Sequence, residues 1–298
     1  MKYVFILLTT VLFSLSAKGQ NLPVAWEELT ASDFVEAVKK SEGVCLIPVG
    51  VIEKHGQHLP VGTDYFIVQE ICRRLAEKEY CIVYPTLFTG VTFEAYHQPG
   101  AISYSPELLF QFLDETCREI ARNGIKKIVL VNGNGSNNSF LNYFCQAQLD
   151  TPRDYAVYWI YQWEGSVSNY KVDEEARRKI SEMRKTTGGG HGAEMETSMM
   201  MAIRPDLVKL ERANLESGQN LNRLQHLPSS TYLGIKWYAQ YPNLYEGDAS
   251  SANADLGKIY FEGLDAELIK IIKADDLTLP LHNEYYEETL SPLDTKAK

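Results

Sequence analysis

The chain has 298 residues, of which 45% are hydrophobic and 23% are charged. This is the composition of a globular protein, and it excludes a largely disordered chain. The formal net charge of −10 argues against a nucleic-acid partner, because phosphate contacts need clustered Lys and Arg side chains.

The N-terminus has the pattern of a secretory signal peptide. Lys2 precedes an apolar run over residues 3–15, and the small residues Ala17 and Gly19 follow it. The run is shorter than the roughly 20 apolar residues that cross a bilayer, and polar chain follows directly. We therefore expect residues 1–19 to be removed. The mature protein would then be exported, to the periplasm or the medium, with no membrane span.

The remaining chain, residues 20–298, is predicted to form one domain. No linker, charge block or low-complexity tract divides it. The five cysteines lie inside apolar segments, and a chain of this size needs no disulfide framework. We expect them to be buried free thiols.

Strand-like and helix-like patterns alternate along the chain. A helix is expected from Thr30, a second from Asp64, and a third from Ser105 and Pro106 to Gly124. Buried strands are expected at 44–49, 80–84, 127–131 and 155–160, and later helices at 174–184, 193–203 and 253–273. The alternation predicts an α/β layered sheet, in which functional residues collect at the carboxyl ends of the strands.

The segment after the first strand, residues 48–64 (PVGVIEKHGQHLPVGTD), carries the strongest chemical pattern. Glu53 and His55 are two apart and point to the same side of an extended chain. Glycine and proline then let the loop turn back, and Asp64 arrives at a helix start. Two carboxylates and an imidazole within a dozen residues suit zinc or manganese. On spacing alone, a polar loop with Asp64 as a helix cap is an equal alternative.

This segment resembles the creatininase family signature, approximately P-x-G-x-x-E-Q-H-G-x-H-L-P-x-x-T-D, and only Lys54 departs from its core. Three further blocks follow in the family's order, at residues 99–103 (PGAIS), 131–137 (VNGNGSN) and 191–198 (HGAEMETS), with a weaker fifth at 247–250. The resemblance implies a three-layer α/β/α sandwich around a largely parallel sheet. It also implies a homo-oligomer, often a hexamer.

The resemblance carries site roles onto single residues. Glu53 matches a ligand of a first metal, His55 a ligand of a second, and Asp64 the carboxylate between them. His191 matches a catalytic histidine that donates a proton. Glu196 matches an acid near the metals, and Glu194 is the alternative acid, as ligand or catalytic group. In a helix these two glutamates are about 200° apart, so they cannot both face one site.

The sequence departs from the family at Asn134, which stands where the family has a metal-binding histidine and is therefore a candidate metal ligand. Ser136 likewise stands where creatininases proper have a glutamate. An amide oxygen is a poorer zinc ligand than imidazole, so the first metal is at risk. A single-metal enzyme, an altered pair using His58 or Glu194, and an inactive descendant all remain open.

The resemblance implies an amidohydrolase that cleaves a non-peptide C–N bond of a small molecule, a cyclic amide or amide, with metal-activated water and one or two divalent ions. Creatinine itself is disfavoured by Asn134 and Ser136. Two other classes stay open: a small-molecule binding protein that has lost catalysis, and a structural protein, which would leave the loop signatures without an explanation.

Overall fold

The computed structural model describes residues 22–160, 172–186, 190–264, 266–273 and 277–289. The expected signal peptide, residues 1–19, lies outside the described residues.

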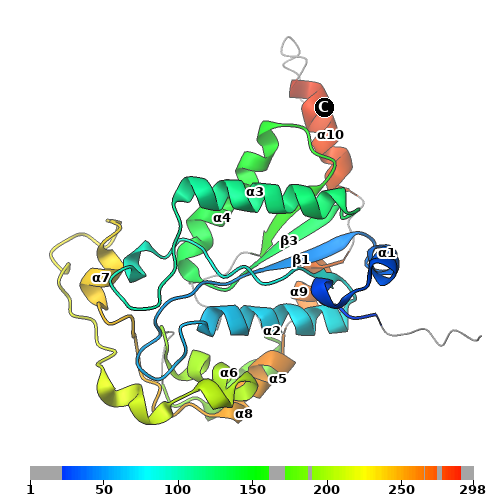
Figure 1. Cartoon of the computed structure of the whole chain (residues 1–298). Coiled ribbons are helices and arrows are strands. Elements are labelled where there is room, and N and C mark those ends of the chain that lie inside the picture. Colours follow the sequence, from blue (N-terminus) through cyan, green and yellow to red (C-terminus); the bar gives the residue numbers. More distant parts are fainter. Residues whose placement is uncertain (1–21, 161–171, 187–189, 265, 274–276, 290–298) are drawn as a thin grey trace, which may run out of the picture.

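A four-stranded parallel sheet lies at the centre of the described chain (Figure 1). Its order is β2-β1-β3-β4, with strands β1 (Val44–Val49), β2 (Ile82–Val83), β3 (Lys127–Asn132) and β4 (Ala156–Ile160). β1 pairs with β3 along its whole length, from Val44 opposite Lys127 to Val49 opposite Asn132. The carboxyl ends of these two strands therefore lie side by side.

Helices cover both faces of the sheet, as Figure 1 shows. They are α1 (Ala31–Lys40), α2 (Thr63–Lys78), α3 (Pro106–Arg122), α4 (Asn138–Ala147), α5 (Glu174–Met183), α6 (Glu194–Ile203), α7 (Lys236–Gln240), α8 (Ala254–Glu262), α9 (Ala266–Ile271) and α10 (Thr278–Thr289). Alternate residues of β1 enter opposite cores. Val44 and Leu46 pack with α2, α6 and α8, while Cys45 and Ile47 pack with α3 and α4. The expected α/β/α sandwich is confirmed.

Local sequence explains several helix starts. The Thr30 hydroxyl accepts a hydrogen bond from the Asp33 N–H at 3.2 Å, and the Ser105 hydroxyl accepts one from the Leu108 N–H at 3.3 Å. Both residues are the expected N-caps. α2 begins at Thr63, one residue before the predicted start.

Three elements differ from the prediction. The helix expected at 253–273 is broken, because α8 ends at Gly263 and Leu264 then pairs with Val172 in an antiparallel bridge. α4 was not predicted, since Asn and Ser open it and it follows β3 after only a short loop. α10 was not predicted either.

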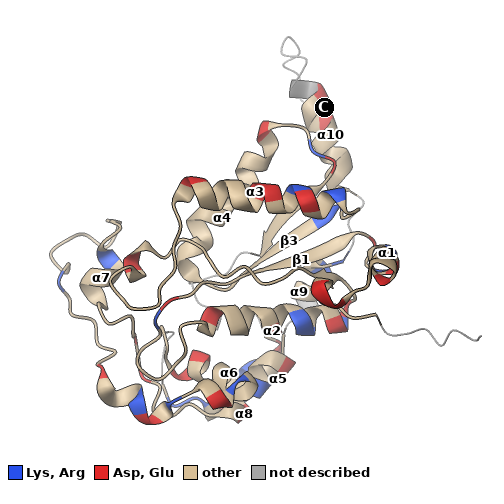
Figure 2. Cartoon of the chain, in the orientation of Figure 1, with Lys and Arg blue, Asp and Glu red and all other residues tan. Residues whose placement is uncertain are grey.

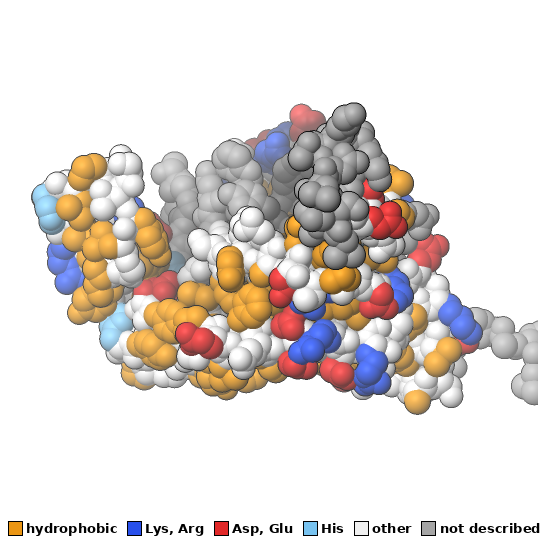
Figure 3. Space-filling model, turned by 90° about the horizontal axis from the view of Figure 1, so that it is seen from above, with side chains coloured by type: hydrophobic (Ala, Val, Ile, Leu, Met, Phe, Trp, Pro, Cys, Tyr) orange, Lys and Arg blue, Asp and Glu red, His pale blue; other side chains and the backbone are white. Residues whose placement is uncertain are grey.

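The surface carries both signs of charge along its helices (Figure 2). Arg178, for example, pairs with Glu175 and Glu182 on α5. Apolar side chains are exposed among the polar ones on the face seen from above (Figure 3). Leu108 and Phe112 of α3 are among the exposed large apolar residues. All five cysteines are free, as expected, and all but Cys145 are buried. None of the described helices is long and apolar enough to cross a membrane.

Candidate metal centre

The loop after β1 folds back on itself and brings Asp64 to Glu53 and His55. The Glu53 N–H donates to the Val61 carbonyl at 2.9 Å, which closes the loop. Gly50 allows the start of α2 to pass, because a Cβ at this position would lie 2.7 Å from the Tyr65 Cα. Asp64, in the first turn of α2, thus reaches the carboxyl end of β1.

Two other parts of the chain complete the site. β3 ends at Asn132, and Asn134 follows it directly. Glu196 lies in the first turn of α6, and His191 precedes that helix. His191 is fixed by a two-way backbone pair with Glu246, at 3.0 and 2.9 Å. The site therefore forms where β1 and β3 end, the usual place for functional groups in a parallel sheet.

His55, Asp64 and Glu196 form one buried cluster. The His55 Nε2 lies 3.2 Å from the Asp64 Oδ1 and 3.9 Å from the Glu196 Oε2. The His55 Nδ1 lies 3.2 Å from the Glu53 carbonyl oxygen, which can only accept. In the neutral imidazole, Nδ1 therefore carries the hydrogen, and the lone pair of Nε2 faces the two carboxylates.

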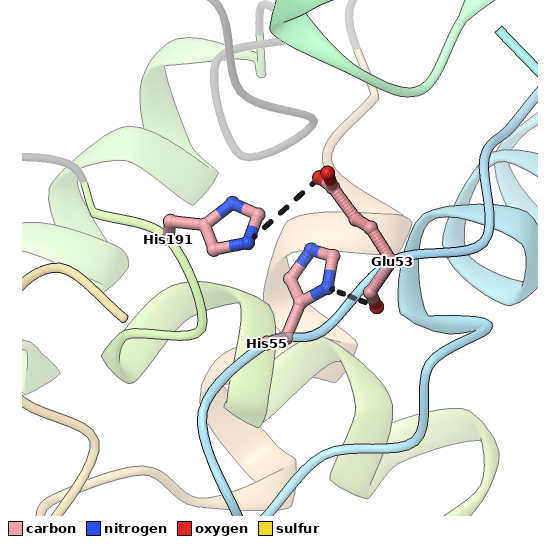
Figure 4. A group of neighbouring side chains, drawn as sticks. All are labelled: Glu53, His55 and His191. Atoms are coloured by element: carbon pink, nitrogen blue, oxygen red, sulfur yellow. Dashed lines mark hydrogen bonds and ion pairs between the residues drawn. The ribbon is translucent and has the colours of Figure 1, made fainter. Parts of the chain in front are cut away.

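Glu53, His55 and His191 form a second cluster (Figure 4). The two imidazole rings stack with centroids 3.9 Å apart. The His191 Nε2 lies 3.8 Å from the Glu53 Oε1 and 2.9 Å from the Lys54 carbonyl oxygen. Because a carbonyl only accepts, Nε2 of His191 is the nitrogen that carries the hydrogen.

Burial and neighbouring charges shift the acidities of these groups. Burial, together with the charge of Asp64, holds the pKa of Glu53 well above its usual range. Burial alone would lower the pKa of His55, but the surrounding carboxylates, Asp64 first, raise it to about 10. Burial and the nearby His55 lower the pKa of His191 to about 3, so this imidazole is neutral at physiological pH.

Asn134 presents its nitrogen, not its oxygen, to the carboxylates. Its Nδ2 donates to the Glu53 Oε1 at 2.7 Å and to the Asp64 Oδ2 at 3.0 Å. Its Oδ1 accepts from the Ser136 backbone N–H at 3.0 Å and from the Ser136 hydroxyl. The reverse orientation would place the NH₂ group against a backbone N–H, so Ser136 fixes the amide. The metal-ligand role predicted for Asn134 therefore has no geometric support.

The structure also separates the two candidate glutamates. Glu196 lies in the cluster and accepts from the Gly192 N–H at 2.6 Å. The Glu194 carboxylate is fully buried elsewhere, where it accepts from the Lys185 N–H and from the N–H and hydroxyl of Thr186. The catalytic or ligand role predicted for Glu194 is thus not supported. Its position on the helix, about 200° from Glu196, is the reason.

We expect Glu194→Gln to destabilise the metal-free protein by on the order of 3 kcal/mol, because an NH₂ group would replace an acceptor facing buried donors. Metal binding by the folded variant should change little. Chemical denaturation and metal analysis measure the two effects. Glu196→Gln is the matched variant and should lose metal instead. If Glu194→Gln lost metal while its stability stayed unchanged, Glu194 would be a metal ligand after all.

The other candidate side chains have supporting contacts. His58 Nε2 bonds with the Gly192 carbonyl at 2.9 Å and the Thr197 hydroxyl at 3.0 Å, so it braces the loop before α6. Lys54 points away from the cluster and donates to Glu216 at 2.6 Å. The structure therefore does not support His58 as a ligand of an altered metal pair.

Glu94 and Trp237 both lie near the site, and the sequence alone assigned neither of them a role. Glu94 lies in the 3-10 helix Phe93–Ala95, and its charge contributes to the raised pKa of Glu53. Trp237, on α7, packs edge-on against His191 with ring centroids 5.6 Å apart. No spacing pattern marks either residue, because both reach the site only through long-range packing.

The donor chemistry of the His55, Asp64 and Glu196 cluster fits a divalent metal. It offers one imidazole nitrogen and two carboxylates, all buried, on atoms within 4.8 Å of one another. Zinc and manganese both accept such a ligand set. The molecule is thus defined as an α/β/α sandwich with a buried acid and imidazole cluster able to hold a cation at the carboxyl ends of its strands.

Comparison with known proteins gives the particular family. Residues 27–272 match the creatininase family model, described as creatinine amidohydrolase. The chain belongs to the creatininase family of hydrolases, as the sequence motifs indicated.

Three relatives that are similar in sequence to this chain are named for different activities. The creatinine amidohydrolase of Pseudomonas putida is 30% identical over 62% of this chain and 74% of its own. The 3-dehydro-scyllo-inosose hydrolase of Thermotoga maritima is 24% identical over 84% of this chain and 83% of its own. The mycofactocin precursor peptide peptidase of Mycobacterium ulcerans is 28% identical over 72% of this chain and 79% of its own.

Solved structures support the fold. A creatinine amidohydrolase superposes with a TM-score of 0.69 at 24% identity, covering 84% of this chain and 96% of the other. A creatininase described as a manganese form gives a TM-score of 0.66 at 22% identity, and a mutant creatininase of Zn-Zn type gives 0.67 at 22%. Both cover 89% of this chain and 98% of theirs.

Proposed function

We propose that this protein is a metal-dependent amidohydrolase that cleaves a non-peptide C–N bond, in an amide or cyclic amide of a small molecule, with zinc or manganese. The observation that carries the proposal is the buried cluster of His55, Asp64 and Glu196, with the ring of His191 beside it. A family in which manganese and zinc forms are known supports the choice of metal.

A divalent metal held by this cluster would act as a Lewis acid, lowering the pKa of water and polarising the scissile carbonyl. The chain's own groups do the rest. His191 carries its hydrogen on Nε2, and its backbone pair with Glu246 and the edge of Trp237 fix the ring. From there the neutral ring can pass a proton from the attacking water on to the leaving nitrogen, which departs poorly without one.

The substrate is a small molecule other than creatinine. The named relatives act on creatinine, on 3-dehydro-scyllo-inosose and on a precursor peptide, so the family scaffold serves different chemistries. Asn134 and Ser136 alter the site next to the carboxylates, and this change supports a substrate of the chain's own.

The purified protein is expected to contain tightly bound zinc or manganese and to hydrolyse a member of a panel of lactams, ureas and formamides. Removal of the metal by a chelator should abolish turnover, and added zinc or manganese should restore it, because the metal supplies the Lewis acid. Metal analysis by mass spectrometry and the substrate screen measure this. Activity that survives complete metal removal would contradict the proposal.

A binding protein for a small molecule is the second candidate function. The observation that favours it is the amide of Asn134, which places a hydrogen-bond donor among the carboxylates. Such a protein would hold a ligand without turnover. A purified chain that retains no metal under any loading condition, and yet binds a ligand from the panel, would support this second function.

We also propose that the protein is exported, to the periplasm or the medium, and acts as a homo-oligomer. The N-terminal pattern of Lys2, an apolar run and small residues supports export. Exposed apolar side chains on α3, Leu108 and Phe112, are consistent with a surface that associates.

The native protein is expected to begin at about Gln20, because cleavage after the small residues Ala17 and Gly19 removes the signal. N-terminal mass spectrometry of protein from the native host measures the first residue, and cell fractionation measures the compartment. An intact Met1 on protein from the cytoplasmic fraction would contradict export.

A further inference from the structure

Two acid and imidazole clusters share His55, and the structure gives them different donor chemistry. In the cluster with Asp64 and Glu196, the His55 Nε2 faces two carboxylates and no backbone acceptor, so a cation held by these carboxylates can displace its proton. In the cluster with Glu53 and His191, the nearest imidazole nitrogen is the Nε2 of His191, which donates its hydrogen to the Lys54 carbonyl. A nitrogen that carries a hydrogen offers no lone pair to a metal.

Asn134 adds a second obstacle at Glu53. Its Nδ2 places two N–H bonds on the Glu53 Oε1 and the Asp64 Oδ2, the side on which a cation shared by these carboxylates would sit. Ser136 fixes that orientation through its N–H and hydroxyl. An N–H group and a metal cation are both electropositive, so they do not occupy the same position between two carboxylates.

The loop that holds Asn134 is itself fixed. The Asn132 side chain donates to the Asn134 carbonyl at 2.7 Å and accepts from the Asn134 N–H at 3.1 Å. Asn137 donates to the same Asn132 side chain at 3.2 Å and accepts from the Val91 N–H at 2.8 Å. The amide donor is therefore part of a built network and not a loose surface group.

We propose that this protein binds one divalent cation, on His55, Asp64 and Glu196, and that the Asn134 amide takes the place of a second cation beside Glu53. Glu53 is then a carboxylate next to the metal and not a ligand of it. This inference rests on the proposed metal-dependent hydrolase function, and it assigns Glu53 a different task from the ligand role that the family resemblance implied.

A Glu53 carboxylate that binds no metal can act as the general base. The attacking water loses a proton to the Glu53 carboxylate while its oxygen forms a bond to the carbonyl carbon. The Glu53 proton then passes to the neutral His191 ring, which releases one from Nε2 to the leaving nitrogen as the C–N bond breaks with its electron pair on nitrogen. The products are the acid and the amine, Glu53 and His191 return to their starting charges, and no oxidant or reductant is needed. General bases of this kind contribute about 10²–10⁴-fold to rate.

The decisive variant is Glu53→Gln, which keeps the shape of the side chain and removes the base. We expect wild type and variant to hold one zinc per chain after dialysis, with dissociation constants within about threefold, while kcat falls by about 10²–10⁴-fold. Metal analysis, zinc titration calorimetry and turnover measure the three quantities. Loss of the metal from Glu53→Gln would overturn the inference, because it would make Glu53 a ligand.

Asn134→His tests the second part of the inference, that the Asn134 amide takes the place of a second cation. It replaces the amide donor by an imidazole lone pair, so zinc stoichiometry should rise from one toward two. Asn214→His, at an exposed position in the 3-10 helix Leu210–Leu215, is the matched control and should stay at one. Two tightly held zinc ions in the active wild type would overturn only this inference. No bound metal in an active wild type would instead overturn the proposed metal-dependent function.

Discussion

Asp64→Asn is expected to weaken zinc or manganese binding by more than about 100-fold and to abolish hydrolysis. Changes outside the ligand shell already cost about 10–100-fold in metal affinity, and Asp64 lies within it. Its Oδ1 faces the His55 Nε2 and its Oδ2 accepts from Asn134, so an amide here must turn an NH₂ group toward one of two nitrogens. Zinc titration and turnover measure the two losses.

Asp255→Asn is the control for that experiment. Asp255 is the second residue of α8, as Asp64 is the second residue of α2, but its side chain is 76% exposed and pairs with Lys258. Both variants lose an acid from the first turn of a helix, where a negative charge interacts with the helix dipole. Only Asp64→Asn should lose metal. Full metal binding by Asp64→Asn would contradict the assignment of Asp64 as a ligand and with it the proposed metal site.

Much of the fold could be predicted because local chemistry and long-range packing agree. The apolar run at 44–49 becomes β1, and the caps at Thr30 and Ser105 make the hydrogen bonds expected of them. The prediction failed where local signals are weak. A continuous helical pattern over 253–273 hides the break at Gly263, which depends on the contact of Leu264 with Val172 in a distant segment.

The candidate site shows the same division. The proximity of Glu53, His55 and Asp64 could be predicted from their spacing, because one loop brings all three together. Helical geometry alone predicted that Glu194 and Glu196 face different ways. The direction of the Asn134 amide could not be predicted, because it depends on which of its two ends Ser136 holds. Glu94 reaches Glu53 only through the folded arrangement of loops.

The position of Glu196 depends on how closely α6 packs against α8. Gly257 of α8 lies against the backbone of α6, and a Cβ there would be 2.1 Å from the Ser198 carbonyl oxygen and 2.8 Å from the Met199 Cα. These atoms belong to the backbone and cannot rotate away. Ser198 is two residues after Glu196, so any movement of α6 that relieves the clash also displaces a metal ligand.

Gly257→Ala is therefore expected to destabilise the protein by about 3 kcal/mol, the upper end for overpacking, and to lower its melting temperature by on the order of 10 °C. Metal affinity should fall in the folded variant, because Glu196 moves with α6. Differential scanning calorimetry of the metal-free protein and zinc titration measure the two effects. Gly234→Ala is the control, since a Cβ at Gly234 would meet nothing within 4 Å, and its stability should stay within about 0.5 kcal/mol of wild type. Equal stability of the two variants would mean that the contact between α6 and α8 is looser than the structure describes.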